Sequence, residues 1–321
     1  MRLLVRQFGV AAGAAMLLAT TAMVAEAAYP DKPITMIVPF GGGSGELFTR
    51  QIAQALKDRL GQPVLVETRP GAAGNVGTAA LARSKPDGYT LVFGASNIVI
   101  NPHISKVQYD TFKDLAPVAR LIEYSPVIVI NPSIPAKTLP ELIAWTRQQP
   151  GGANYSFGGV NNQLVMDHLA KVSGGKLNAI PYRGEADMIR AVMANEIPIS
   201  PTTLTSAAGQ LQAGTIRPIA MASAKRISSY PDIPTIAESY PEYGSFSSWF
   251  SFLAPAGTPK EIVDLLNKTM NEAVQSAELK PKLIESGYEI LNNTPEEFAA
   301  FIRREYDRMA KLIKDYNIND H

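Results

Sequence analysis

The sequence predicts an α/β fold, and three patterns carry that prediction. Apolar segments typical of strands alternate along the chain with segments whose apolar residues recur at helical spacing. Several helical segments open with a threonine followed three residues later by a glutamate. The chain has 321 residues and is 46% hydrophobic, enough for about two domains with real cores. A repeated strand, helix, strand order implies parallel sheets covered by helices on both sides.

The first elements follow this alternation closely. The strand-like "ITMIVP" (34–39) leads into the helical "ELFTRQIAQALKDRL" (46–60), and "PVLVET" (63–68) is a second strand. A helix near 75–84 and the strand "YTLVFG" (89–94) come next. Ligands of such sheets bind beyond the carboxyl ends of the strands, so the loop after the first strand is a candidate site.

Later helices are marked by their starts. A threonine hydroxyl can accept from a free helix amide while the glutamate reaches back, and both favour a helix N-terminus. The three predicted starts are Thr138 with Glu141, Thr258 with Glu261, and Thr294 with Glu297. The last helix, from Pro295 onward, should pack on a core through one apolar face. That face consists of Phe298, Phe301, Ile302, Tyr306, Met309 and Ile313.

The first 27 residues predict a secretory signal peptide. Arg2 and Arg6 precede a run of small and apolar residues that ends in Ala25-Glu26-Ala27, an A-x-A cleavage signal. A membrane anchor is the alternative, but the run is short and rich in alanine for a span of about 20 residues. We therefore expect cleavage after Ala27.

Charge and cysteine content exclude several classes of function. Residues 1–27 hold two arginines and one glutamate, so 28 basic and 28 acidic residues remain after cleavage. A neutral chain without a basic run argues against a nucleic-acid or acidic-membrane partner. There is no cysteine, which excludes disulfides and thiolate metal sites, and only three histidines are present. We expect no metal and no cofactor.

The glycine-rich loop in "IVPFGGGSGELFTR" (37–50) matches none of three known motifs. A P-loop needs a lysine and a hydroxyl after its last glycine, yet Gly45 is followed by Glu46 and Leu47. A dinucleotide fingerprint would need glycine at position 46 or 48, and a nucleophile elbow centred on Ser44 would need it at 46. Two readings remain: a tight turn, or free backbone amides at a helix start that suit a small anion such as a carboxylate.

A second loop favours the anion-binding reading. "FGGVNNQ" (157–163) also follows a strand-like segment and also leads into a helix. Two amide-rich helix starts could therefore come from two lobes. A third glycine-rich segment, "RPGAAGNVG" (69–77), is more typical of a structural turn.

An ordered series of segments spans essentially the whole chain after residue 27. It includes "YPDKPITMIVPF", "QPVLVETRPGAAGNVGTAALARSKPDGYTLVFG", "IPYRGEADMIRAVM", "LQAGTIRPIAMASAKR", "YPDIPTIAES" and "SSWFSFLAPAGTPKEIV". This series resembles the tripartite tricarboxylate transporter substrate-binding proteins, the Bug or TctC-like family. The resemblance implies a type II-like, two-lobe α/β solute-binding protein, each lobe a mixed sheet flanked by helices, with a cleft between the lobes. Its lobes would comprise residues 28–125 with 247–321, and residues 126–246.

The resemblance also implies a function. The protein would be a periplasmic, monomeric receptor that captures a small carboxylate, a dicarboxylate or an aromatic acid, and delivers it to TctA/TctB-like membrane subunits. Backbone amides and short polar side chains of both loops would hold the carboxylate, because a charged group leaving water needs several donors. The expected ligand-binding residues are Phe40, Gly41, Gly42, Gly43, Ser44, Gly45, Ser96, Asn97, Gly158, Gly159, Val160, Asn161, Asn162, Arg183 and Thr202.

The chain departs from the family pattern inside these loops. Gly41 stands where the family has proline, and Gly45-Glu46 stand where it has a Thr-Asp pair. Asn161 and Asn162 occupy the second loop, where the family carries serines or threonines followed by histidine. Thr202 is the nearest counterpart of an acidic or amide position. Amide side chains both donate and accept, so a ligand with a second polar end fits this composition.

Several residues have structural readings beside the functional ones. Arg183 could pair with a ligand carboxylate or tie down its own loop, and we favour the loop slightly. Phe40 or Trp249 could flank an aromatic ligand, although buried aromatic residues are more often core. His103 and His168 lack metal-ligand spacing, and Asp167 next to His168 should point elsewhere on a helix.

The alternative function is an exported, hydrolase-like enzyme that acts on a carboxylated molecule in the same cleft. No nucleophile, base and orienting group can be assembled from recognisable spacing. We therefore expect a binding protein and no catalytic residues.

Overall fold

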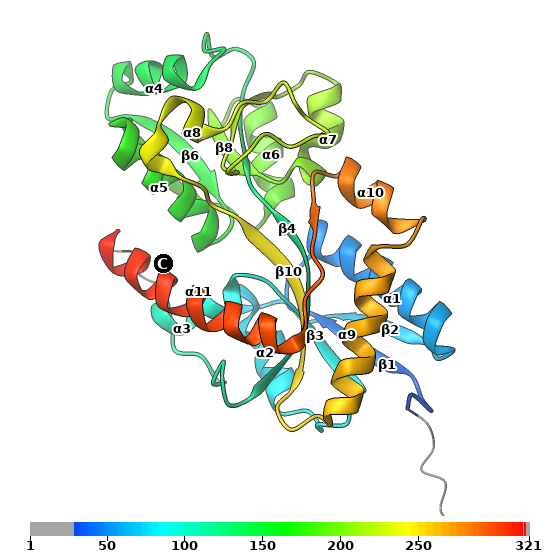
Figure 1. Ribbon diagram of the computed structural model, residues 1–321. Helices are drawn as coiled ribbons and strands as arrows, with labels where there is room; N and C mark the ends of the chain where they lie inside the picture. Colours follow the sequence, from blue (N-terminus) through cyan, green and yellow to red (C-terminus); the bar gives the residue numbers. More distant parts are fainter. Residues whose placement is uncertain (1–28, 317, 319–321) are drawn as a thin grey trace, which may run out of the picture.

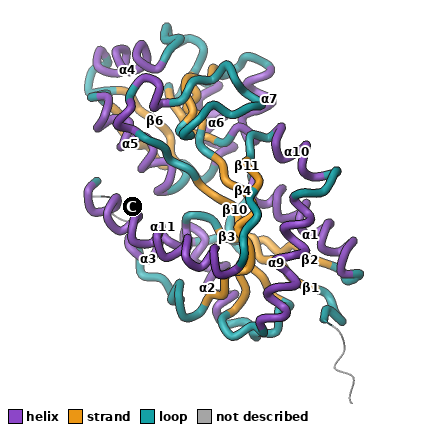
Figure 2. Tube along the Cα trace, in the orientation of Figure 1, coloured by secondary structure: helices purple, strands orange, loops and turns teal. Residues whose placement is uncertain are grey.

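The structure is a computed structural model that describes residues 29–316 and 318. The predicted signal peptide and its cleavage site lie outside these residues. The described chain forms two lobes, each built on one sheet with helices against it (Figure 1). Helices and strands alternate through both lobes, as the sequence pattern predicts (Figure 2).

The elements of the two lobes have the following bounds. Lobe 1 contains β1 (Ile34–Val38), α1 (Ser44–Leu60), β2 (Val64–Thr68), the short 3-10 helix η1 (Ala72–Gly74), α2 (Asn75–Ala82), β3 (Thr90–Gly94), α3 (Asn97–Ile104), β4 (Leu115–Tyr124), β10 (Ser248–Pro255), α9 (Lys260–Val274), α10 (Leu279–Glu285), β11 (Glu289–Ile290) and α11 (Pro295–Asp315). Lobe 2 contains β5 (Val127–Ile130), α4 (Leu139–Gln148), β6 (Ala153–Phe157), α5 (Val160–Ser173), β7 (Leu177–Pro181), α6 (Glu185–Met193), β8 (Ile199–Thr202), α7 (Leu204–Gln212), β9 (Arg217–Met221), α8 (Ile236–Ser239) and the 3-10 helix η2 (Pro241–Tyr243).

Both sheets are mixed, as the family resemblance implies and unlike the purely parallel sheets that strand-helix alternation alone predicts. The strand orders are β11-β4-β10-β3-β1-β2 and β7-β6-β8-β5-β9. In lobe 1, β1 pairs in parallel with β2 and β3, whereas β10 is antiparallel to β3 and β4. In lobe 2, β6 is parallel to β7 and β8, whereas β5 is antiparallel to β8 and β9. The chain passes from one sheet to the other between the antiparallel strands of these sheets, from β4 to β5 and from β9 to β10.

The chain changes sheets between Tyr124 and Val127 and returns between β9 and β10. The strands β4 and β10 lie side by side through the centre of the molecule (Figure 1). Since β4 runs toward lobe 2 and β10 runs back, β3, β1 and β2 all end toward lobe 2. By the same argument, β8 ends beside the start of β5, at Thr202 opposite Val127, so β6, β7 and β8 end toward lobe 1. The carboxyl ends of the parallel strands in each sheet therefore point at the other lobe.

Apolar helix faces cover the sheets. One face of the lobe 1 sheet packs with α1 and α9 around Phe48, Phe252 and Leu266. The other face packs with α3 and α11. Phe298, Ile302, Met309 and Ile313 are buried, and Phe301 and Tyr306 pack against them half-buried, which confirms the predicted apolar face of α11.

Two of the three predicted helix starts are confirmed and one is wrong. Thr138 and Thr294 form complete capping boxes with their glutamates. Thr258 does not cap α9: the N-cap is Pro259, and the Thr258 hydroxyl donates to the Pro255 carbonyl oxygen at 2.7 Å. The end of β10 offers that carbonyl within reach, so the hydroxyl is used in the turn that precedes the helix.

Candidate functional site

The start of α1 has the geometry of a free helix N-terminus. Gly42 and Gly43 adopt φ values of 69° and 94°, in the left-handed region that favours glycine. Gly43 is the N-cap, and no side chain caps the helix. Its first backbone amides are therefore left for another partner, unlike those of α4 and α11, which the chain caps itself. This loop follows β1, so it lies at the lobe 1 end that faces lobe 2.

Two helix starts in lobe 2 share this feature. Gly159 caps α5 and Gly184 caps α6, in both cases without a side-chain hydrogen bond. A Cβ on Gly158 would lie 3.1 Å from Met188 Sδ and 3.5 Å from Gly184 Cα, so the two loops pack together. The start of α6 was missed in the sequence, although the glycine ahead of a helical pattern in "YRGEADMI" is the same signal that marks α1 and α5.

The predicted lobe 1 side chains gather beside this loop. Asn97 is 8% exposed, and its Oδ1 accepts from the Ala95 amide at 3.0 Å. Its Nδ2 has no hydrogen-bond partner. A Cβ on Gly74 would come within 3.0 Å of both this Nδ2 and the Phe40 ring, which places Phe40 and Asn97 next to each other. Ser96 is the N-cap of α3, and its side chain makes no capping bond.

The predicted lobe 2 side chains gather at the end of β8. Asn162 Nδ2 donates to the Pro201 carbonyl oxygen at 3.0 Å. The neighbouring Thr202 is fully buried, yet its Oγ1 has no partner. Asn161 Oδ1 is likewise buried without a partner. Buried polar atoms without partners cost about 1–3 kcal/mol each, so they mark places where a further group would be stabilising.

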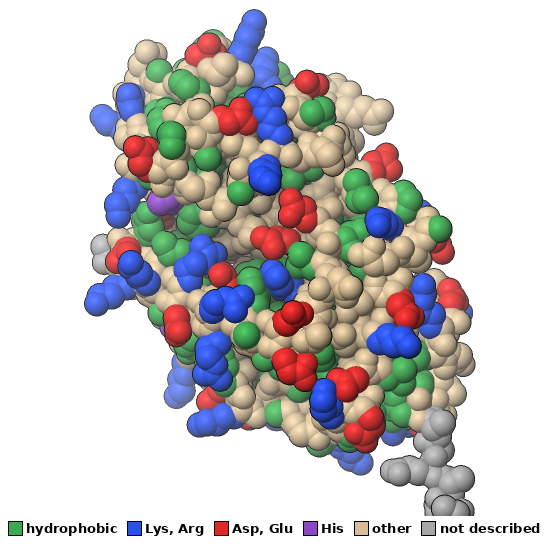
Figure 3. Space-filling view, in the orientation of Figure 1, with side chains coloured by type: hydrophobic (Ala, Val, Ile, Leu, Met, Phe, Trp, Pro, Cys, Tyr) green, Lys and Arg blue, Asp and Glu red, His purple; other side chains and the backbone are tan. Residues whose placement is uncertain are grey.

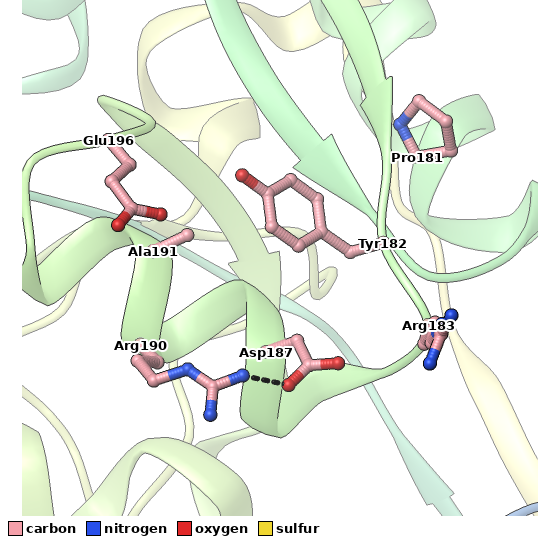
Figure 4. Close-up of a pocket in the computed structure, with 7 residues that line it drawn as sticks. All are labelled: Pro181, Tyr182, Arg183, Asp187, Arg190, Ala191 and Glu196. Atoms are coloured by element: carbon pink, nitrogen blue, oxygen red, sulfur yellow. Dashed lines mark hydrogen bonds and ion pairs between the residues drawn. The ribbon is translucent and has the colours of Figure 1, made fainter.

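Arg183 directly precedes Gly184, in the loop that packs against Gly158. Its side chain is exposed, and it makes none of the hydrogen bonds or ion pairs found among the described residues, so the structure supplies no tie to its own loop. It borders an open hollow of about 550 Å³ on lobe 2, at the opposite end from Glu196 (Figure 4). Asp187 and Arg190 form an ion pair along α6 at the edge of this hollow, and none of the glycines of the α1 and α5 loops lines it (Figure 4).

A second hollow, of about 460 Å³, lies where both lobes contribute to one surface. It is lined by residues of α1 and α10 together with Thr205 of lobe 2, and Ser44 is the one predicted ligand-binding residue in its lining. Thr205 Oγ1 donates to the Ser286 carbonyl oxygen at 3.2 Å, a direct contact between the lobes.

Glu185 is a functional candidate that the sequence did not indicate. It is the first residue of α6, and its carboxylate accepts from the Thr203 amide at 3.1 Å, from Thr203 Oγ1 at 3.0 Å, and from Ser206 Oγ. These groups form the start of α7, so that helix start already holds a carboxylate of the protein itself. Burial raises the pKa of the Glu185 carboxyl, although the hydrogen bonds from Ser206 and Thr203 act in the opposite direction.

This pKa predicts a pH dependence of stability. In the unfolded chain Glu185 titrates near its ordinary pKa of 4.5, and in the folded chain it titrates at higher pH. The folded protein therefore binds the proton more tightly, so this contribution to stability is complete below pH 4.5 and is lost as the pH rises through the raised pKa. The melting temperature of the wild type minus that of Glu185→Gln should fall from pH 4.5 toward neutrality.

Glu238→Gln is the matched control because the pKa of Glu238 is lowered in the folded protein, whereas that of Glu185 is raised. The hydrogen bond from Arg226 lowers the pKa of the exposed Glu238 carboxyl to about 2. Its contribution is present above the ordinary value of 4.5 and is lost as the pH falls toward about 2. Equal pH profiles for Glu185→Gln and the wild type would contradict the assignment for Glu185.

The other singled-out residues have structural roles. His103 Nε2 lies 3.0 Å from the Tyr306 carbonyl oxygen. His168 bonds the Tyr243 carbonyl oxygen and the Tyr316 hydroxyl, whereas Asp167 accepts from Tyr155, so the adjacent pair does point apart. Trp249 is 1% exposed and packs edge-on against Phe301, which supports its reading as core.

The surface charges of the described residues are mixed in sign, as the neutral composition predicts. Lysine, arginine, aspartate and glutamate side chains are interspersed over the face seen in Figure 3. Among residues 29–316 and 318, there is no cluster of three or more histidine, aspartate and glutamate side chains suited to a metal ion. No helix in this part of the chain is both long and apolar enough to span a bilayer.

Comparison with known proteins places these features in a family. Residues 48–318 match the family described as "Tripartite tricarboxylate transporter family receptor". Protein BugT of Bordetella pertussis is 35% identical over 298 residues, which cover 89% of this chain and 90% of that protein. The R. palustris protein solved with adipate is 30% identical, with a TM-score of 0.85, over 91% of this chain and 99% of that one. The periplasmic binding protein BugD is 26% identical, with a TM-score of 0.84, over 91% of this chain and all of that one.

These relatives confirm the resemblance and the two-lobe fold, and they are solute-binding receptors rather than enzymes. The match runs from residue 48, within α1, to residue 318, so it covers most of both lobes and the start of α5 at Gly159, whereas the glycine-rich start of α1 lies just before it. The chain belongs to the tripartite tricarboxylate transporter receptor family of periplasmic binding proteins.

Proposed function

We propose that this protein is an extracytoplasmic receptor that binds a small carboxylate, a dicarboxylate or an aromatic acid, and delivers it to TctA/TctB-like membrane subunits. The observation that carries the proposal is the pair of uncapped helix starts at Gly43 and Gly159. Each follows a strand whose carboxyl end points at the other lobe. A carboxylate between them would accept from amides of both helices.

The physical chemistry of these two starts favours an anion. Each helix start carries about half a positive charge, and its first amides have no intrahelical acceptor. Because the amides sit on rigid backbone, they bind a carboxylate without ordering long side chains. The adipate found with a relative that is 30% identical supports the same ligand class for this chain.

We further propose how the lobes move. Residues 28–125 and 247–321 would form one rigid body and residues 126–246 the other, hinged at the two crossings beside β4 and β10. Closure would bring the α1 and α5 starts onto the same carboxylate. The radius of gyration in solution scattering should shrink when ligand saturates the protein. An unchanged radius at saturation would argue against hinge closure.

The ligand class is tested by a thermal-shift screen of the purified protein. The panel consists of aliphatic di- and tricarboxylates, aromatic carboxylates and acidic amino acids, each with its amide or ester as a matched neutral control. A ligand at about 100 times its dissociation constant should stabilise the fold by about 2.7 kcal/mol. Stabilisation by an acid and not by its amide would support the proposal. A flat response from folded, ligand-free protein across all the acids would refute it.

A further inference from the structure

The neighbours of Asn97 determine which way its side-chain amide is oriented. Its Oδ1 lies 3.0 Å from the Ala95 backbone nitrogen. A backbone N–H can only donate, so the oxygen of the side-chain amide must face it. The free end is therefore Nδ2, a donor, and it is buried without a partner next to Phe40 and Gly74. On the lobe 1 side, the unused hydrogen-bonding group is thus a donor, like the amides of the α1 start.

The amide group of Asn162 is oriented the opposite way. Its Nδ2 lies 3.0 Å from the Pro201 carbonyl oxygen. A carbonyl oxygen can only accept, so the nitrogen must face it and Oδ1 is the end left over. No hydrogen bond to this Oδ1 occurs among the described residues. Asn162 therefore offers an acceptor from the half-buried start of α5.

Other groups beside Asn162 also accept. The fully buried Thr202 hydroxyl, next to Pro201, has no partner and can accept as well as donate. Asn161 Oδ1 is buried without a donor. The next residue along from Thr202 holds the Glu185 carboxylate through its amide and hydroxyl. The Glu185 carboxylate already has its donors, so the groups left without partners at the end of β8 and the start of α5 are the Asn161 and Asn162 oxygens and the Thr202 hydroxyl.

We infer that the ligand carries a hydrogen-bond donor, a hydroxyl or an amide N–H, that meets Asn162 and Thr202. This inference rests on the proposed function, in which the carboxylate lies at the starts of α1 and α5. A second carboxylate beside these groups could accept from the Thr202 hydroxyl but would face the Asn161 and Asn162 oxygens as acceptor against acceptor, and a plain alkyl end would leave all three groups unpaired. The ligand class narrows to hydroxy- or amido-carboxylates, and plain dicarboxylates bind less tightly.

Calorimetric titration of the purified protein with matched acids tests this inference. For each of several chain lengths the set contains the plain acid, the dicarboxylate, and the α-hydroxy and ω-hydroxy acids, with benzoate and its hydroxy derivatives beside them. The best hydroxy acid should bind about tenfold more tightly than its plain counterpart, and more tightly than the dicarboxylate of the same length. Plain acids or dicarboxylates that bind as tightly as every hydroxy acid would overturn the inference and leave the proposed function standing. Failure of all the acids would instead refute the proposed function.

Three variants assign the effect to residues. Thr202→Val removes one buried, unpaired hydroxyl while keeping the shape, so the fold should tolerate it. It should remove the roughly tenfold advantage of the hydroxy acid and leave the plain acid within about twofold. Thr202→Ser, which keeps the hydroxyl, should keep the advantage. Asn97→Asp keeps the bond to Ala95 and turns the free donor into an acceptor, so it should weaken every acid by about tenfold or more. Equal losses of the hydroxy acid and the plain acid in Thr202→Val would overturn the role of Thr202.

Discussion

Replacing Gly43 by aspartate should weaken carboxylate binding by about hundredfold or more while the protein stays folded. The new carboxylate would stand at the N-cap of α1, where the proposed site holds the carboxylate of the ligand. Two like charges about 4 Å apart repel by about 4 kcal/mol at an effective dielectric constant of about 20. The new side chain would also accept the helix amides that the ligand needs.

The fold should tolerate this change because the position has room. A Cβ on Gly43 meets no atom within 4 Å, so the cost comes from its φ of 94° alone. Because ψ is −169°, this is a backbone conformation that glycine adopts far more readily than any other residue, and the strain costs about 1–3 kcal/mol for asparagine and aspartate alike. Gly43→Asn is therefore the matched control, with the same backbone strain and nearly the same shape but no charge. Calorimetric titration should show that the asparagine variant binds within about tenfold of the wild type. Equal affinity of Gly43→Asp and the wild type would remove this loop from the site.

Replacing Gly77 by alanine should destabilise the protein by about 1–3 kcal/mol. Gly77 lies in α2 against the end of the first strand, and a Cβ there would come within 2.7 Å of Pro39 Cβ and 2.9 Å of Pro39 Cα. The backbone and ring atoms of Pro39 cannot rotate away from the new Cβ as the end of a flexible side chain could. Because Pro39 precedes Phe40 and the glycines of the proposed site, ligand affinity should fall together with stability.

Gly209→Ala is the control for this substitution. Gly209 lies in the interior of α7 and is exposed, and a Cβ there would meet no atom within 4 Å. At this position alanine should raise stability by about 0.5–1 kcal/mol, because glycine is the poorer helix former. Urea unfolding of both variants measures the two free energies. A loss of less than about 0.5 kcal/mol in Gly77→Ala would show that α2 can shift away from Pro39.

Sequence patterns anticipated the elements that depend on near neighbours. The apolar face of α11 repeats within one helix, and the Thr138 box joins residues three apart, so both were predictable. Thr258 has the same local pattern as Thr138, but a carbonyl at the end of β10 takes its hydroxyl. The Thr-x-x-Glu pattern alone could not predict that this carbonyl oxygen would compete for the hydroxyl.

Three properties can be read from the order of residues alone: strands and helices alternate, glycines precede α1 and α5, and the chain resembles one receptor family. Two others emerge only when the chain is folded. Glu185 occupies the start of α7, and Asn97 and Asn162 present opposite ends of their amides. The difference arises because the orientation of an amide depends on its partner. The spacing of nearby residues cannot predict a partner that is distant in the sequence. Pro201 lies 39 residues from Asn162, and the two come together only when β6 and β8 pair.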